Sequence, residues 1–528
     1  MKKITKLLIL LFTLPCAVMA ETYLPPEVPL PDLSKQTSIN EISAVSQKLG
    51  SFKPAAFVKR SSLNGTWKMS PLLTSEKRFG KASAEELKFA DAAFDDSKWN
   101  DAKVPWNWFH YKGCSPKKLF REGKLLDPDN AGGNDARGVI NPYTKAWYRR
   151  TFELKEIPAQ ERILLDFIRI NNEAELYVNG KSAAYHQGGF IPFVCDITPF
   201  LKVGKNTLAL RVMSEYRPHD NHFIRTLGTL WGYGSYRAGI VGDVSLVTVP
   251  APRIQTVKMV TPASGKLELH ATVINTGSKN LSVTPGVSVV RALKGAAPAG
   301  KEFAPVTLKP GINKLKFTYD VKSPALWSPA KPELYFATLF FRNDKKILSA
   351  DTQRIGFRDF VIKGTKFYLN GKETYLFFES AHSNRYCGAA TPSGNTVDMR
   401  TVIAEYKKRG YNMLRTAHHP VPQEFLDIAD ELGMMIYDEW GMCFVDKVHE
   451  KLFEENNRIE LTKFIEADHN HASVVMWSLG NEVKHKNSMA VVPSWINKST
   501  LSAKKICRNV RSVPSPVSPG SMLTVTTN

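Results

Sequence analysis

The stretch GYNMLRTAHHPVPQEFLDIADELGMMIYDEWG, residues 410–441, determines the predicted fold of the C-terminal part of the chain. Two short apolar runs, NML and MMIY, each end in polar residues, and an amphipathic helical pattern lies between them. Helical patterns over 399–410 and 458–470 and apolar runs over 372–379 and 473–481 continue the alternation. Strands that alternate with helices predict a parallel sheet with right-handed crossovers.

The four predicted strands amount to half of a closed barrel. A TIM (β/α)8 barrel needs eight strands and typically about 250 residues, so we expect 357–483 to form only its first half. In such folds the chemistry lies at the C-terminal ends of the strands. Polar residues follow three of the strands here, at Arg415 to His419, at Asp438 to Trp440, and at Asn481 and Glu482.

The region before the barrel is predicted to be entirely β. Residues 56–250 contain many short β-type runs, among them AWYRRTFEL, ERILLDFIRI and NTLALRVM, which favour a jelly-roll sandwich. Asn179 and Gly180 predict a hairpin turn, because both residues tolerate positive φ. Residues 251–356 have the strand spacing of a smaller immunoglobulin-like sandwich. The predicted fold class is therefore multidomain β plus α/β.

Both ends of the chain differ from these domains. Residues 1–20 combine three lysines, an apolar run and a small-residue cleavage site, and predict a signal peptide. We therefore expect an exported protein, periplasmic or extracellular. Residues 21–55 resemble a linker. Residues 484–528 contain no acid and show neither helical nor strand periodicity, and we expect an atypical tail.

Charge and cysteine content exclude several classes of protein. The net charge is +21, of which the signal contributes +3 and the tail +7, and the remaining +11 is dispersed among acids. Without a basic helix or an aromatic RNA-binding motif, nucleic-acid binding is not expected. No apolar segment approaches the roughly 20 residues that span a membrane. The scattered cysteines indicate neither a zinc site nor a disulfide framework.

Glu482 is the central candidate for catalysis. A carboxylate that follows a strand, beside Asn481 and the apolar-aromatic wall that includes Trp477, can hold a raised pKa and act as a general acid and base. The simpler alternative is a surface acid at a strand end. The polar ends of the two neighbouring strands favour the functional interpretation.

Other strand-end residues allow two interpretations each. Arg415 either fixes carboxylates by bidentate pairing or supports the barrel. His418 and His382 either contact substrate or pack in loops. Asp438 and Glu439 either bind a metal or have a structural role, which we prefer because no His or carboxylate cluster is near them in sequence. The sequence thus supports no cofactor, and neither a divalent nor a monovalent cation.

The sequence resembles glycoside hydrolase family 2, the β-galactosidase, β-glucuronidase and β-mannosidase group. WSLGNE, preceded by DHNHASVVM, is similar to the acid/base signature of the family. AELYVNGKSAAYHQGGFIPFVCDITPFLKVGKNTLALRV is similar to its sugar-binding sandwich, and PALWSPAKPELY to its immunoglobulin-like domain. The resemblance covers residues 60–483 in order.

This resemblance implies retaining hydrolysis of a terminal β-linked sugar by two carboxyl groups. Glu482 falls on the acid/base position and Asn481 on the residue that contacts the sugar 2-hydroxyl. Arg415, His418 and Glu439 fall on positions that line the pocket. The wording SLGNE favours a β-galactoside. Family members often form oligomers, so the resemblance is compatible with a homo-oligomer.

The sequence departs from the family pattern at several places. The first-strand motif appears as FFESAH and keeps only His382, and no Glu-x-His metal sequence follows DEW. The nucleophile of the family lies on the seventh barrel strand, and no acid follows Glu482 in this chain. We therefore expect a crippled hydrolase, with 484–528 out of frame or otherwise foreign. The alternatives are a non-catalytic glycan-binding protein and a purely structural β-sandwich protein.

Overall fold

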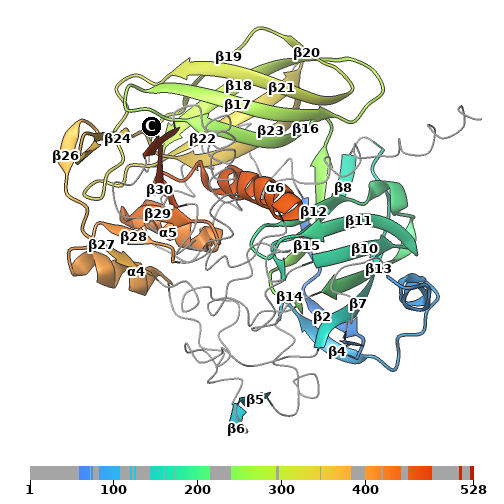
Figure 1. The fold of residues 1–528 in the computed structure, drawn as a ribbon. Helices are drawn as coiled ribbons and strands as arrows, with labels where there is room; N and C mark the ends of the chain where they lie inside the picture. Colours follow the sequence, from blue (N-terminus) through green and yellow to red (C-terminus); the bar gives the residue numbers. More distant parts are fainter. Residues whose placement is uncertain are drawn as a thin grey trace, which may run out of the picture.

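The computed structural model describes residues 59–71, 82–106, 143–159, 161–171, 173–213, 239–292, 296–344, 346–381, 399–417, 420–441 and 450–478. It also gives the backbone of five short strands outside these ranges, which are β3 (Leu73–Thr74), β5 (Leu119–Arg121), β6 (Lys124–Leu126), β31 (Val510–Val513) and β32 (Thr524–Thr527). Figure 1 shows the two β sandwiches as separate bodies, with the helices of the C-terminal region beside them.

The first sandwich consists of two antiparallel sheets. The smaller sheet has the order β1 (Lys59–Ser62), β15 (Val244–Pro250), β8 (Glu161–Phe167), β12 (Phe193–Asp196). The larger has the order β11 (Lys181–Gln187), β10 (Glu173–Val178), β13 (Gly204–Met213), β7 (Tyr143–Leu154), β2 (Gly65–Met69), β4 (Asn100–Val104), with β3 on β7. Short elements complete it: α3 (Ala84–Leu87), η3 (Lys88–Ala90), η6 (Thr198–Phe200) and the pair β9 (Ile170–Asn171) and β14 (Gly239–Ile240).

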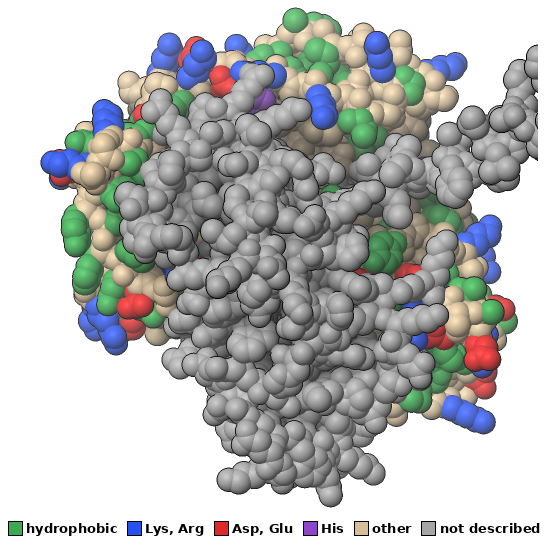
Figure 2. All heavy atoms as spheres, in the orientation of Figure 1, with side chains coloured by type: hydrophobic (Ala, Val, Ile, Leu, Met, Phe, Trp, Pro, Cys, Tyr) green, Lys and Arg blue, Asp and Glu red, His purple; other side chains and the backbone are tan. Residues whose placement is uncertain are grey.

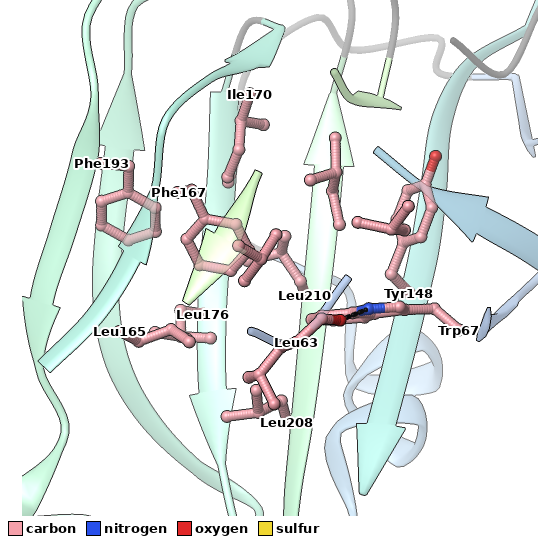
Figure 3. Packing of buried hydrophobic residues seen from close by; sticks show 14 of the residues in the cluster. Leu63, Trp67, Tyr148, Leu165, Phe167, Ile170, Leu176, Phe193, Leu208 and Leu210 are labelled. Atoms are coloured by element: carbon pink, nitrogen blue, oxygen red, sulfur yellow. Dashed lines mark hydrogen bonds between the residues drawn. The ribbon is translucent and has the colours of Figure 1, made fainter. Parts of the chain in front are cut away.

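The core of this sandwich lies between its sheets. Trp67, Phe167 and Leu210 are fully buried there and come from three different strands, as the sticks in Figure 3 show. The predicted hairpin is confirmed: Asn179 has φ 51° and Gly180 φ 80°, and they join β10 to β11. These positive φ angles explain why an Asn-Gly pair occupies the turn.

A second, smaller sandwich follows. One sheet has the order β16 (Arg253–Val260), β17 (Lys266–Asn275), β21 (Gly311–Asp320). The other has the order β19 (Ala299–Glu302), β18 (Leu281–Arg291), β22 (Tyr335–Asn343), β23 (Lys346–Ile355), with β20 (Val306–Leu308) on β18. Along β17 every second residue is buried, among them Leu267 and Leu269, because alternate side chains face the opposite sheet.

The C-terminal region is a parallel sheet with helices, which confirms the predicted fold class. The parallel strands lie in chain order: β27 (Phe378–Ser380), β28 (Met413–Arg415), β29 (Met435–Glu439), β30 (Val474–Ser478). The helices are α4 (Met399–Lys408), α5 (Gln423–Leu432) and α6 (Glu450–Asp468). Their apolar faces bury Phe425 and Phe464 against the sheet residues Leu414 and Ile436.

The predicted bounds of two elements were wrong. The run 372–379 is not one strand: Lys372–Thr374 form β26 in a meander with β24 (Phe360–Lys363) and β25 (Lys366–Leu369), and the barrel strand begins only at Phe378. The turn at Asn370 and Gly371, both with positive φ, folds β26 back onto β25. Helix α6 begins at Glu450, before the predicted residue 458. The tail, whose sequence shows no strand periodicity, contains β31 and β32.

Strand β32 continues the parallel sheet in the opposite direction. It pairs antiparallel with β30, with Trp477 opposite Val525, and β31 pairs with β32. Strand β32 therefore covers the edge of β30. At the opposite edge, beside β27, Tyr375, Phe377 and Phe378 are exposed.

The described residues show how positive charge is distributed on one face and how long and apolar the helices are. Lys and Arg side chains are scattered over the described part of the face in Figure 2 and do not gather in one patch. Among the described residues, no helix combines the length and apolarity that a membrane crossing requires.

Candidate active site

Glu439 and Arg415 form a buried ion pair at the C-terminal end of the parallel sheet. Arg415 Nε donates to Glu439 Oε2 at 2.8 Å, and Arg415 Nη2 donates to Oε1 at 3.0 Å. Glu439 has no solvent exposure and Arg415 only 6%. The geometry is bidentate, the arrangement in which a guanidinium holds a carboxylate most specifically.

Two hydroxyl groups also form hydrogen bonds with Glu439. Ser478 Oγ donates to Glu439 Oε2 at 2.6 Å, and the backbone N–H of Glu439 donates to Thr416 Oγ1 at 2.7 Å. Arg415, Glu439 and Ser478 are the last residues of β28, β29 and β30. Parallel strands end at one edge of the sheet, so residues far apart in the chain meet there.

The contacts of Glu439 favour a structural role over metal binding. Its charge is neutralised by Arg415, and both carboxylate oxygens accept hydrogen bonds. Among the described residues, the group of His and carboxylates close enough to share an ion is Asp427, Asp430 and His471, which does not include Glu439.

The carboxylates of this group are already paired with a cationic side chain, that of Arg354. Arg354 of β23 donates to Glu431 Oε1 at 2.6 Å and pairs with both Asp427 and Asp430. Burial opposes the charge of Arg354, but these three carboxylates raise its pKa. Likewise, burial would lower the pKa of His471, and Asp430 raises it through a 2.8 Å hydrogen bond. We therefore assign this group to a charge-compensated contact between the second sandwich and α5.

The segment before β30 is held by the second sandwich. The Asn470 side chain accepts from the N–H of Met259 at 2.9 Å and donates to the carbonyl of Val257 at 2.8 Å, so it extends the pairing of β16. Arg358 donates to the carbonyls of Ala472 and Val474. The DHNHASVVM motif thus fixes the start of the strand that leads to Glu482.

The structure brings together two of the six predicted site residues, Arg415 and Glu439. Asn481, Glu482, His418 and His382 lie outside the described residues. Strand β30 ends at Ser478, four residues before Glu482.

Sequence reasoning missed Thr416 and Ser478. Both lie in the motifs that carried the prediction, LRTAHH and WSLGNE. Their position directly at strand ends was the available signal, because a small hydroxyl residue there can bond a neighbouring strand end.

Two sandwiches followed by the first strands of a parallel α/β barrel define a multidomain β plus α/β protein, and sequence comparisons identify its family. Three domain models match in order: the glycosyl hydrolases family 2 sugar-binding domain over 134–250, the family 2 domain over 252–358, and the family 2 TIM barrel domain over 360–507. Together they cover more than two thirds of the chain. The chain belongs to glycoside hydrolase family 2.

The related proteins carry two activity names. A Formosa agariphila protein with a provisional β-glucuronidase name is 29% identical over 76% of this chain and 44% of its own length. A Bacteroides ovatus β-galactosidase is 27% identical over 75% of this chain and 45% of its own length. The chain thus spans less than half the length of these relatives.

Solved structures agree on the fold. The crystal structure of a Bacteroides uniformis β-glucuronidase matches 85% of this chain and 51% of its own, with a TM-score of 0.65 and 23% identity.

Proposed function

We propose that this chain is the sugar-binding and acid/base part of an exported, retaining β-glycosidase. In the first step, Glu482 gives a proton to the glycosidic oxygen as a nucleophilic carboxylate attacks the anomeric carbon. In the second step, Glu482 takes a proton from the water that hydrolyses the glycosyl-enzyme. Asn481 contacts the 2-hydroxyl of the sugar, and His418 and His382 line the pocket.

The observation that carries this proposal is the network of Arg415, Glu439 and Ser478 across three strand ends. It neutralises the buried charge of Glu439 beside Ser478, the last residue of the strand that precedes Glu482. This leaves Glu482 for the acid/base role, which needs a carboxyl group that gains and loses a proton.

The substrate we propose is a terminal β-linked sugar, with a β-galactoside first and a β-glucuronide second. SLGNE supports the galactoside, and the B. ovatus relative carries that activity name. The F. agariphila relative supports the glucuronide. A nucleophilic carboxylate must come from sequence other than 484–528, because those residues contain no acid. We therefore expect little turnover from residues 1–528 alone.

The second candidate is glycan binding without turnover, which the match of residues 134–250 to the family 2 sugar-binding domain favours. Purified chain is assayed with nitrophenyl β-galactoside and β-glucuronide, and calorimetry with the free sugars measures binding. A second series adds a polypeptide that carries the C-terminal barrel half of a family member. Turnover that appears only in the mixture supports the glycosidase proposal. Sugar binding without turnover in either series supports the glycan-binding alternative.

A further inference from the structure

Asp438 and Asp468 form a buried pair of carboxyl groups. Asp438 is fully buried in β29 and Asp468, at the end of α6, is 2% exposed. Their side chains are within hydrogen-bonding distance of each other. Thr416 Oγ1 donates to Asp438 Oδ1 at 3.0 Å, and Gln423 Nε2 donates to Asp468 Oδ1.

The contact between these two groups requires a hydrogen. In the described part of the chain, Asp438 Oδ2 receives no N–H or O–H from a donor side chain or from the backbone. An ionised carboxylate only accepts hydrogen bonds, whereas a protonated one also donates. Two adjacent ionised carboxylates repel each other, so one of the two is protonated and donates a hydrogen bond to the other.

The surrounding cations do not replace this proton. Arg415 is paired with Glu439, on the next residue of β29. His471 bonds Asp430 and Gln423, and its charge reaches Asp438 only through space. Arg169 of the first sandwich acts on Asp468 by its charge. The carboxyl pair is therefore bonded by Thr416 and Gln423, which are neutral.

We propose that Asp438 and Asp468 share one buried proton, and that this pair positions Glu439. Thr416 makes the connection: its hydroxyl donates to Asp438 and accepts the backbone N–H of Glu439. The pair also joins the end of α6 to β29, and through Gln423 to the start of α5. This inference goes beyond the glycosidase proposal and does not require turnover.

The shared proton predicts a pH dependence of stability. Burial raises the pKa of Asp438 to about 6, and burial together with Asp438 raises the pKa of Asp468. A carboxyl whose pKa is higher in the folded than in the unfolded state stabilises the fold at low pH. That contribution is lost as the pH rises from the unfolded pKa near 4 through the folded pKa.

The test uses Asp438→Asn and Asp468→Asn in the full chain. Each amide replaces the shared proton with an N–H donor and keeps the acceptor for Thr416 or Gln423. The infrared spectrum at pH 7 reports protonated carboxyl groups through their C=O stretch. We expect each variant to lose the band of one carboxylic acid. In wild type the shared proton should make the folding equilibrium constant fall with rising pH by up to about tenfold per pH unit. In each Asn variant we expect this fall to be smaller.

Two controls separate the shared proton from a loss of packing. Glu460→Gln removes a different buried carboxyl, so it should leave the Asp438 band unchanged. Asp438→Ala removes both hydrogen bonds and should destabilise the chain, and Asp438→Asn should restore stability. The proposal is overturned if both Asn variants retain the complete carboxylic-acid band and the wild-type pH slope. It is also overturned if each Asn variant unfolds as readily as Asp438→Ala.

Discussion

The guanidinium of Arg415 and the carboxylate of Glu439 form two hydrogen bonds across the ends of β28 and β29, at 2.8 and 3.0 Å. Glu439 is fully buried and Arg415 nearly so, and each is the main neutralising partner of the other. The pair is a buried part of the candidate active site. Because each charge depends on the other, removing either one should lower the stability of the folded chain.

Arg415→Met should destabilise the chain by about 3–5 kcal/mol, because it leaves the Glu439 charge buried without its cation. Urea unfolding at pH 7 measures this change. The matched control is Lys68→Met, since Lys68 pairs with Asp101 at the surface at 2.8 Å. The control should cost no more than about 1 kcal/mol. Equal effects of the two substitutions would contradict the buried role of Arg415.

Arg354→Met should loosen the contact between the second sandwich and α5. Arg354 is the cation that Asp427, Asp430 and Glu431 share, so its loss leaves three carboxylates close together. We expect faster amide hydrogen exchange in α5 and in the start of β30, and a destabilisation of about 3–5 kcal/mol.

The control for Arg354 is Arg342→Met, which removes the exposed pair with Glu302 on the same sheet. It should leave exchange in α5 unchanged. Exchange that is unaffected in Arg354→Met would show that the cluster does not hold the two domains together.

Glu460→Gln should stabilise the chain at neutral pH. Among the described residues neither carboxylate oxygen of Glu460 has a hydrogen-bond partner, and the group lies against Gly188 of the first sandwich. Burial raises its pKa well above the ordinary value, and Glu173 adds to the shift against the opposing charge of Lys463. The raised pKa means that stability falls as the pH rises above about 4.

At pH 8 the Gln variant should therefore unfold with a free energy higher by at least about 1 kcal/mol, the equivalent of one pKa unit. Near pH 4 the two proteins should differ little. Thermal unfolding across this pH range measures the difference, and Glu405→Gln, at an exposed position on α4, should change neither value. A Gln variant less stable than wild type at pH 8 would refute the assignment.

The fold class was predictable because its signals are local. Alternating burial along β17 and the Asn179-Gly180 turn both follow from neighbouring residues. The start of the barrel was not predictable, because the apolar run 372–379 suits a meander and a buried strand equally well. Only the turn at Gly371 assigns its first residues to β26.

The site was partly predictable for the same reason. Strand-end polarity identified Arg415 and Glu439, whose pairing the structure shows. The partnership of Asp438 with Asp468 depends on how the end of α6 packs against β29. No pattern within the sequence encodes that packing, so the pair could not be predicted.

The most direct test of the central proposal is turnover by the Glu482→Gln variant, mixed with the C-terminal barrel half of a family member. Gln cannot donate the proton, so we expect a loss of about 10²–10⁴-fold with a nitrophenyl β-glycoside relative to the wild-type mixture. Azide needs no general base to attack the glycosyl-enzyme, so it should restore turnover and yield a β-configured glycosyl azide. Turnover equal to wild type in the Gln variant would contradict the assignment of Glu482 as the acid/base.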